Sequence, residues 1–349
     1  MIPLVRPSFP DPGVFIPLWK KATQESGIYS NFGPLWWMAA DRLSEVTDRI
    51  ALPVSNGTEA VTLAALASQI ENANDDYAPA VEAFTFEATR IAFERVQHLH
   101  DRAEWGLREV RSDSALGAKE RKTGVVIRTV PFGCHRDFTK PQFDDEPTVI
   151  DAAGGFGPNA WGTHGLDATV RKDQPIAVSF HATKNFPIGE GGAVLLPLAW
   201  KRGAEAVVQA MNFGFSQNRR TRITSHYATN AKLDELRCAM LIAQLDRADY
   251  FRERCARIRK HTLRLIDHVD QLRAPYQLGT WQSLVVVQID QLADAMGILA
   301  DRGIACREVY PTSRQDLLTD AEKNLLALPS DCTDDELAQV MDALREVYR

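Results

Sequence analysis

The sequence predicts an α/β fold in which a mostly parallel central sheet forms a large domain and a smaller α/β domain follows it. Between residues 50 and 200, short apolar runs alternate with segments of helical periodicity, as in repeated strand–helix units. The apolar runs are continuous, as in parallel strands that are covered on both faces. From Lys232 the pattern changes to a long amphipathic helical stretch. We therefore expect a large domain at 1–247 and a small domain at 248–349, divided within that stretch near Ala248.

The elements of the large domain follow from local patterns. The first fifty residues combine helical segments with turns, and SGIYSNFGP at 26–34 contains two glycines and a proline, which indicate an irregular loop. Beyond them we expect a strand and a turn at 50–57, a helix at 58–70, a strand at 77–84 and a helix at 85–96. Further short apolar runs lie within 124–133, 147–155, 176–180 and 191–197. The polar stretch 101–122 is predicted to be a helix or a long loop.

The C-terminal third is expected to start with helix. Residues 232–269 interleave acidic residues and arginines at helical spacing. SLVVVQID at 283–290 is predicted to be a strand, and TDDELAQVMDALREVY at 333–348 to be the closing helix. Thr333, followed three residues later by Glu336, forms a capping box at the start of that helix.

Composition narrows the class of protein. The chain has 349 residues, 45% of them hydrophobic, and a net charge of −6 without a long basic tract, which argues against nucleic acid as the main partner. No run approaches the roughly 20 apolar residues of a membrane span, and MIPLVRPSFP does not resemble a secretory signal. Five dispersed cysteines fit reduced thiols, so we expect a cytoplasmic protein. Cys134 and His135 are adjacent, but without a second pair we predict no metal site.

A lysine lies in a tight loop between two apolar runs. The loop SFHATKNFPIGEGG, at 179–192, follows the run 176–178 and precedes the run 193–196. Burial there would lower the pKa of the Lys184 ammonium, and a neutral amine can attack a carbonyl group to form a Schiff base. The alternative is a surface lysine whose stem lies on the protein, which three nearby glycines and two core strands make less favourable.

Three further positions directly follow apolar runs, where ligands bind in an open parallel sheet. SNGT at 55–58 leads into a helix whose free N–H groups favour phosphate, although Thr58 alone fits a plain N-cap. Asp151 ends an apolar run and would need a cation such as a pyridinium N–H, or it is a turn residue. Phe86 could stack on a planar ring, although taken singly a core position is the simpler interpretation. With Lys184, these positions supply the four attachment points of pyridoxal phosphate (PLP).

Five segments occur in an order that resembles a known family: SNGTEA, AFTFEAT, VIDAAGGFG, SFHATKNFPIGEGG and NAKLDELRCAMLIAQLD. The chain is similar to the PLP-dependent nucleotide-sugar aminotransferases of the DegT/StrS type, which have fold type I. The similarity runs nearly end to end, from IPLVRP to LALPSDCTDDELAQVMDAL. The segments SFHATK, NGT and DAA-x-x-FG resemble most the branch that aminates the 4-keto position of a dTDP-linked deoxysugar.

The resemblance implies roles for the site residues. Lys184 would form the Schiff base with PLP, Asp151 would pair with the pyridinium nitrogen, and Phe86 would stack on the ring. The implied phosphate ligands come from two loops and are Gly57, Thr58 and Ser179. Asn230 would reach the phosphate of the neighbouring subunit's cofactor. The resemblance therefore implies a homodimer with shared active sites.

The resemblance also implies a reaction, which is amino transfer from glutamate to the keto carbon of a nucleotide-diphosphate-linked deoxysugar such as dTDP-4-keto-6-deoxyglucose. The product would serve lipopolysaccharide O-antigen or glycosylated metabolite biosynthesis. The candidates for the diphosphate are the arginines of NRRTRITSHY, namely Arg219, Arg220 and Arg222. Guanidinium groups bind phosphate bidentately, and a solvated basic loop is the alternative. Tyr29 and Asn31 are candidates for the sugar, and His181 is either a ligand contact or a satisfied loop histidine.

Three departures from the family pattern leave other functions open. Gly154 stands where the family usually has Gln or His, Val130-Pro131 where it has His, and the segment 134–147 is shorter than usual. Family members that dehydrate sugars replace the lysine with histidine, so the retained Lys184 favours transamination. The alternatives are a sugar dehydratase, a transaminase of a non-sugar ketone, and a non-catalytic PLP-binding regulatory or partner protein.

Overall fold

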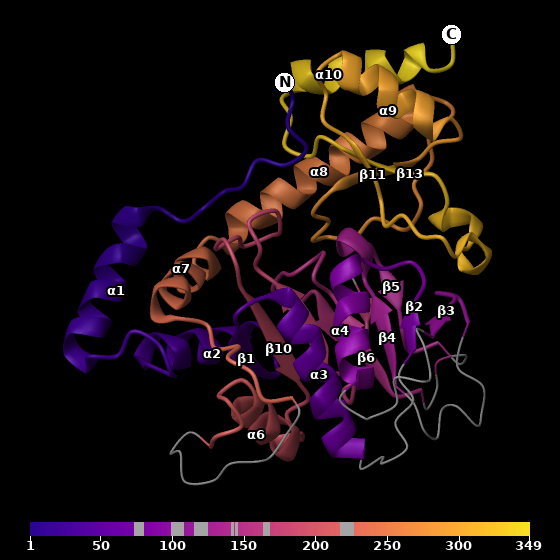
Figure 1. Cartoon of the computed structure of the whole chain (residues 1–349). Coiled ribbons are helices and arrows are strands. Elements are labelled where there is room, and N and C mark those ends of the chain that lie inside the picture. The colour runs from indigo at the N-terminus through magenta and orange to yellow at the C-terminus, as the bar shows by residue number, and fades with distance from the viewer. Residues whose placement is uncertain are drawn as a thin grey trace.

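In the computed structural model, helices pack on a central sheet and a C-terminal unit lies next to it (Figure 1). The structure describes residues 1–72, 80–98, 108–114, 125–140, 143, 146–162, 168–216 and 227–349. Both termini lie at the C-terminal unit, and the N-terminal segment runs from there to the far side of the sheet (Figure 1).

Two helices, α1 (Pro12–Ser26) and α2 (Pro34–Thr47), precede the sheet and are joined by the predicted irregular loop. The residue before α2 provides no side-chain cap. Instead, the buried Glu235 carboxylate accepts hydrogen bonds from the amides of Leu35 and Trp36 at 2.8 and 3.0 Å. This long-range cap satisfies two of the free N–H groups at the start of α2.

The central sheet has seven strands, which in spatial order are β1 (Ile50–Val54), β10 (Gly192–Leu196), β9 (Ile176–Ser179), β6 (Thr148–Asp151), β4 (Val126–Thr129), β2 (Ala80–Glu82) and β3 (Glu109–Val110). The strands from β9 to β3 are parallel, whereas β10 is antiparallel to both of its neighbours. Only the loop 180–191 joins β9 to β10, and such a short connection allows antiparallel pairing alone. The predicted mostly parallel sheet is confirmed.

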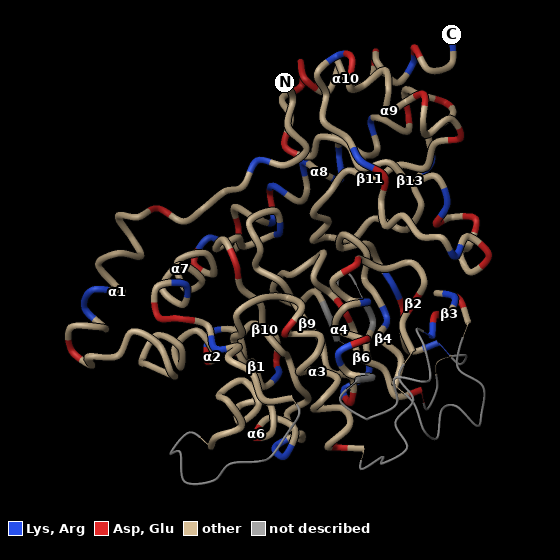
Figure 2. The backbone as a smooth tube through the Cα atoms, viewed as in Figure 1, with Lys and Arg blue, Asp and Glu red and all other residues tan. Residues whose placement is uncertain are grey.

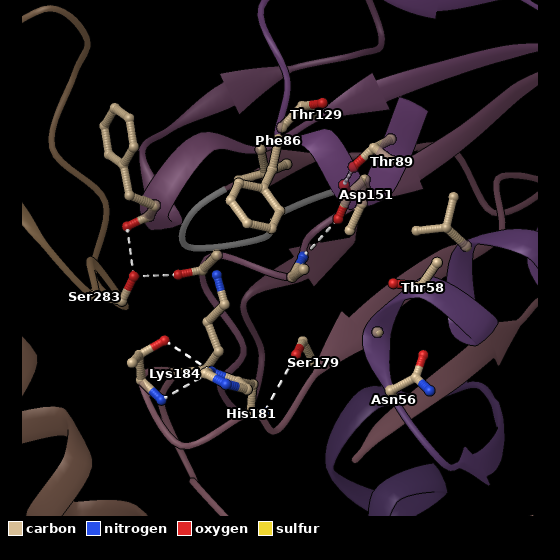
Figure 3. A pocket seen from close by; sticks show the side chains of 18 of the residues that line it. Asn56, Thr58, Phe86, Thr89, Thr129, Asp151, Ser179, His181, Lys184 and Ser283 are labelled. Atoms are coloured by element: carbon tan, nitrogen blue, oxygen red, sulfur yellow. Dashed lines mark hydrogen bonds between the residues drawn. The ribbon is translucent and has the colours of Figure 1, made fainter. Parts of the chain in front are cut away.

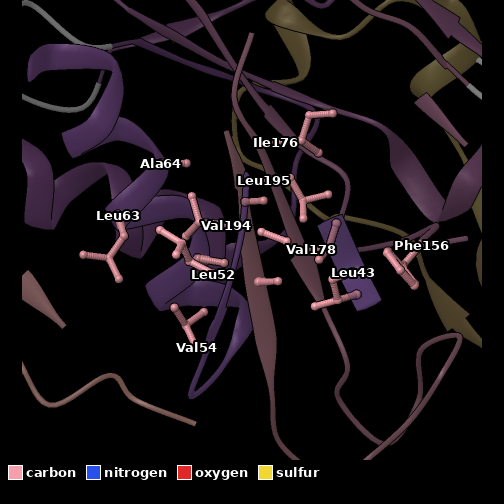
Figure 4. Packing of buried hydrophobic residues seen from close by; sticks show 14 of the residues in the cluster. Leu43, Leu52, Val54, Leu63, Ala64, Phe156, Ile176, Val178, Val194 and Leu195 are labelled. Atoms are coloured by element: carbon pink, nitrogen blue, oxygen red, sulfur yellow. The ribbon is translucent and has the colours of Figure 1, made fainter. Parts of the chain in front are cut away.

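Helix α3 (Gly57–Asn72) is the centre of the core. It packs on β9 and β10 and contacts α4 (Glu87–His98) and α6 (Lys201–Ala210). Every residue from 60 to 68 of α3 is buried, so the helix is covered on all sides instead of being amphipathic. Figure 4 shows side chains of α2, α3 and the strands in this shared cluster. Each fully buried aliphatic side chain there contributes about 1.5–3 kcal/mol.

The C-terminal unit follows a helix break. The predicted helical stretch divides into α7 (Glu235–Leu245) and α8 (Ala248–His268). The later elements are β11 (Val285–Gln288), α9 (Leu292–Asp301), β12 (Arg307–Glu308), β13 (Leu325–Leu328) and α10 (Asp334–Glu346). The three strands form an antiparallel sheet in the order β11-β13-β12. Ile2 pairs with Ile304 and is buried in the apolar cluster of this unit. The predicted capping box of Thr333 and Glu336 is confirmed.

Short elements complete the chain, namely β5 (Arg136–Asp137), β7 (Trp161–Gly162), β8 (Ala168–Thr169) and 3-10 helices at Pro131–Gly133, Gln315–Leu317 and Asp320–Glu322. Of the ambiguous stretch 101–122, residues 108–114 are described and contain β3, and the rest lies outside the described residues. Among the helices of the described ranges, none combines the length and the apolar character that a membrane crossing requires. Acidic and basic residues are interspersed along the described backbone (Figure 2).

Candidate active site

A cavity of about 290 Å³ lies at the carboxyl ends of three neighbouring strands. The last residue of each strand lines it: Thr129 of β4, Asp151 of β6 and Ser179 of β9. These strands are parallel and adjacent, so their ends meet at one edge of the sheet. The starts of α3 and α4 and residues of the C-terminal unit complete the walls. The cavity thus joins both parts of the chain.

Lys184 stands on a loop that is held from two sides. Within the loop, the Ala182 amide donates to the Gly189 carbonyl at 2.8 Å, and Gly189 has a φ of 95°, which favours glycine. Next to the lysine, the buried Asn185 accepts a hydrogen bond from Arg254 of α8 at 3.2 Å. Figure 3 shows the Lys184 side chain pointing into the cavity from this loop.

The surroundings of Lys184 favour its neutral form. Burial lowers the pKa of the Lys184 ammonium, the negative charge of Asp151 opposes this, and the positive charge of Arg307 lowers the pKa further. Nζ lies 5.9 Å from the centroid of the Phe86 ring. A lysine with a lowered pKa is a nucleophile at a pH where an exposed lysine is fully protonated.

Asp151 is the acidic group at the floor of the cavity and is 4% exposed. Its carboxylate accepts hydrogen bonds from the Thr89 hydroxyl and, at 2.9 Å, from the Ala153 amide. Burial raises the pKa of Asp151, while these two hydrogen bonds and the charge of Lys184 oppose the rise. It forms no ion pair with any described residue. A buried carboxylate without an ion-pair partner is suited to bind a cationic group of a ligand.

The start of α3 forms a cradle for an anion. Asn56 caps the helix, because its side-chain oxygen accepts from the Glu59 amide at 2.9 Å. The alternative that Thr58 is the N-cap is therefore wrong, and Thr58 lies in the first turn beside the cavity. A Cβ atom on Gly57 would lie 2.9 Å from Cβ of Ser179, so glycine lets the helix start approach β9 closely. Backbone N–H groups and two hydroxyls converge there, as phosphate requires.

Phe86 lies at the cavity and not in the core. It is 48% exposed, so the core alternative is wrong. The core position in this segment belongs instead to Phe84, which is 2% exposed. The Phe86 ring also lies 6.1 Å from that of Tyr310, centroid to centroid. An exposed aromatic face beside Lys184 is available to a planar ligand ring.

The structure does not bring all the predicted residues together. His181 lines the cavity rim, where its Nδ1 contacts the Thr183 hydroxyl at 3.0 Å. Tyr29, Asn31 and Asn230 are exposed and do not line the cavity, and Asn230 accepts a hydrogen bond from Lys232 at 2.6 Å. Arg219, Arg220 and Arg222 lie outside the described residues.

Among the lining residues that the sequence analysis missed are Thr89, Ser283, Arg307 and Tyr310. Thr89 had a usable signal, because it lies near the start of a predicted helix that directly follows a predicted strand. The other three come from the C-terminal unit, and no local pattern marks them as facing the ends of distant strands.

The arrangement fits PLP residue by residue. An anion cradle, an aromatic face, a buried carboxylate and a lysine of lowered pKa line one cavity. These groups would hold the phosphate, the ring face, the ring nitrogen and the aldehyde carbon. Figure 3 shows Lys184, Phe86 and Asp151 around the same space, with Thr58 and Ser179 at one side.

Comparisons with known proteins show which family model and which relatives the chain matches. A family model described as the DegT/DnrJ/EryC1/StrS aminotransferase family matches residues 147–341, more than half of the chain. Protein Rv3402c of Mycobacterium tuberculosis (strain ATCC 25618 / H37Rv) is 29% identical over 262 residues, which are 70% of this chain and 60% of that protein. The chain therefore spans about 60% of the length of this curated relative.

Solved structures share the fold. A protein of Bacillus cereus ATCC 10987, proposed to be a PLP-dependent aminotransferase, has a TM-score of 0.77 at 22% identity and covers 98% of this chain and 99% of its own. DesI, solved in the presence of its TDP-sugar product, has a TM-score of 0.72 at 22% identity, with 99% of this chain and 92% of DesI covered. At these identities the likeness establishes the fold, which is the expected fold type I.

Proposed function

Because the chain belongs to the DegT/DnrJ/EryC1/StrS aminotransferase family, we propose that it is a PLP-dependent aminotransferase. It transfers an amino group to the keto carbon of a nucleotide-diphosphate-linked deoxysugar. The observation that carries the proposal is the meeting of Lys184, Asp151 and the start of α3 in one cavity at the strand ends. When bound, PLP supplies an aldehyde that captures amines and a ring that accepts electrons.

Each site residue has a separate role in the proposed reaction. Lys184 holds the cofactor and, as a free amine, carries a proton to and from the carbon that bears the transferred nitrogen. Asp151 pairs with the cationic ring nitrogen, and Thr89 and Ala153 orient its carboxylate. Gly57, Thr58 and Ser179 bind the phosphate, and Phe86 covers one face of the ring. Residues of both parts of the chain line the cavity in which these groups meet.

The finer assignment names dTDP-4-keto-6-deoxyglucose as the acceptor and glutamate as the donor. It rests on the segments SFHATK, NGT and DAA-x-x-FG. The family membership is compatible with it, as is the fold shared with DesI, a protein solved with a TDP-sugar product. Arg219, Arg220 and Arg222 are proposed to bind the diphosphate, and Tyr29, Asn31 and His181 to contact the sugar. The product would enter O-antigen or glycosylated metabolite biosynthesis.

We also propose a cytoplasmic homodimer with shared active sites. In it, Asn230 reaches the cofactor phosphate of the neighbouring subunit. The position of Asn230 supports this, because its side chain is exposed and does not line the cavity of its own chain. The expected large domain 1–247 and small domain 248–349 complete the proposal, with the helix break at Asp246–Arg247 as the hinge.

One assay tests the reaction. The purified protein is loaded with PLP and incubated with glutamate and dTDP-4-keto-6-deoxyglucose. The mass of the sugar product is then measured by mass spectrometry. We expect an amino sugar from the wild-type chain and none from Lys184→Ala. The exposed Lys201→Ala serves as the matched control and should retain full turnover.

The alternatives give different results in the same assay. A dehydratase would release a sugar without added nitrogen. A transaminase of non-sugar ketones would aminate 2-oxo acids and leave the sugar unchanged. A non-catalytic binding protein would show cofactor absorbance that glutamate does not alter. Full turnover by Lys184→Ala would refute the assignment of that lysine.

A further inference from the structure

Arg307 is a basic residue at the cavity that the proposed function leaves without a role. It lies on β12, the edge strand of the small sheet, where it pairs with Ala327 of β13. Its side chain is exposed and lines the cavity that contains Lys184. It also lines a second cavity of about 270 Å³, which shares Phe86 and Tyr310 with the first. Arg307 thus stands between the reacting lysine and an adjoining space.

The Arg307 guanidinium is free, unlike nearby arginines. With the described residues it makes no hydrogen bond and no ion pair. Arg90, which lines the second cavity, donates to Glu109 at 3.0 Å, and Arg136 donates to Glu82 at 2.9 Å. Among the described arginines that line either cavity, Arg307 is therefore the one whose donors are available for a ligand. It is also near enough to Lys184 for its charge to lower the pKa of that ammonium.

The proposed reaction needs a cation at this place. Among the described residues that line the main cavity, Lys184 and Arg307 are the lysine and arginine side chains. Lys184 holds the cofactor and transfers the proton in the proposed reaction. Arg307 is therefore the cation that can neutralise an anionic substrate. In an α-amino acid, the carboxylate lies two bonds from the reacting nitrogen, so it must stay close to the position of Lys184 Nζ. A guanidinium group binds a carboxylate through two parallel hydrogen bonds.

We propose that Arg307 binds the α-carboxylate of the amino donor and thereby makes the cavity selective for α-amino acids. The inference rests on the proposed function and deepens it. A diphosphate is the other anion in the reaction. It hangs from the anomeric carbon, across the sugar ring from a 4-keto group, and therefore lies farther from the reacting carbon than a donor carboxylate does. Arg307, which lines the same cavity as Lys184, is therefore better placed to bind the donor carboxylate than to bind the diphosphate.

The test separates the two substrates. In Arg307→Gln loaded with PLP, the glutamate concentration that half-saturates the absorbance change of the first half-reaction should rise about 10- to 100-fold, since the substitution removes hydrogen bonds between two charged groups. The second half-reaction, started with the amino form of the cofactor and the keto sugar, should change less than about twofold. Arg307→Lys should restore part of the glutamate affinity. Arg302→Gln, another exposed arginine of the C-terminal unit, is the control and should behave as wild type.

A binding measurement makes the result independent of turnover. Glutarate carries carboxylates but no amine, and calorimetry should show its binding to the PLP-loaded wild type and its loss in Arg307→Gln. If the wild type binds glutarate through Arg307 but never transaminates, the proposed function fails and the carboxylate site stands. The assignment of Arg307 would be overturned if glutarate bound equally to both proteins or did not bind to the wild type. It would also be overturned if Arg307→Gln impaired only the sugar half-reaction.

Discussion

A Cβ atom on Gly154 would lie 2.5 Å from the backbone nitrogen of Phe132. Phe132 has a φ of 42° inside the short helix Pro131–Gly133, so this backbone turns directly against Gly154. The Gly154 carbonyl in turn accepts a hydrogen bond from Ser283 of the C-terminal unit. Two departures from the family pattern, Gly154 and Val130-Pro131, are therefore one structural feature. Backbone fills the place that a side chain at position 154 would occupy.

We predict that Gly154→Ala destabilises the protein. The methyl group would overlap the Phe132 backbone, which cannot rotate away as a side chain can, and overpacking of this kind costs about 1–3 kcal/mol. The free energy of unfolding, measured by urea denaturation, should fall by that amount. The control is Gly297→Ala in α9, where an added Cβ meets nothing within 4 Å and alanine should stabilise the helix by about 0.5–1 kcal/mol. Equal stability of Gly154→Ala and wild type would show that the backbone turn at Pro131–Gly133 can move to make room for the methyl group.

Thr89→Val should weaken cofactor binding through Asp151. The substitution keeps the shape of the side chain but removes the hydroxyl that donates to the carboxylate. Because this hydrogen bond lowers the pKa of Asp151, its loss raises that pKa and reduces the negative charge opposite the ring nitrogen. The apparent dissociation constant of PLP should rise about tenfold or more. Thr47→Val, at the end of α2 and away from the cavity, should leave it unchanged; a matching loss there would assign the effect to folding.

The pH at which Lys184 captures PLP should depend on its two charged neighbours. Burial lowers the pKa of Lys184, so capture starts at a lower pH than for an exposed lysine. Arg307→Gln removes a repelling charge and raises that pKa, so the profile should move to higher pH. Asp151→Asn removes an attracting charge and should move it to lower pH. Borohydride trapping and mass spectrometry across pH measure the captured fraction, and shifts in the reverse directions would contradict this electrostatic account.

Arg254→Ala should loosen the loop that carries Lys184. Arg254 is buried, pairs with Asp331 at 2.8 Å and donates to Asn185, which is adjacent to Lys184. Removing it leaves the part-buried Asp331 carboxylate and the buried Asn185 amide oxygen without this donor, which costs about 1–3 kcal/mol. We expect the free energy of unfolding to fall by this amount and hydrogen exchange to increase in the loop. Arg257→Ala, exposed on the same helix, is the control. Unchanged exchange near Lys184 would show that the loop is held by its own backbone.

Much of the fold was readable from local patterns. Continuous apolar runs predicted the buried strands, and Thr333 with Glu336 predicted the start of α10. The antiparallel direction of β10 was not predicted, because strand direction depends on the connection and the pairing partner and not on hydrophobic periodicity. The residue that caps α3 was assigned to Thr58 in one interpretation, but Asn56, two residues earlier, accepts the hydrogen bond.

By itself, the sequence determined that Asp151, Ser179 and Lys184 would gather at one edge of a sheet. Asp151 and Ser179 end buried runs, Lys184 lies in the loop after one, and the ends of parallel strands meet, so position along the chain translates into proximity. Only the tertiary structure decided that Arg307 and Ser283 close the same cavity and that backbone occupies the space beside Gly154. The contacts of Arg307 and Ser283 with the strand ends join segments more than a hundred residues apart. Their formation depends on how two packed units meet, and no local periodicity encodes that.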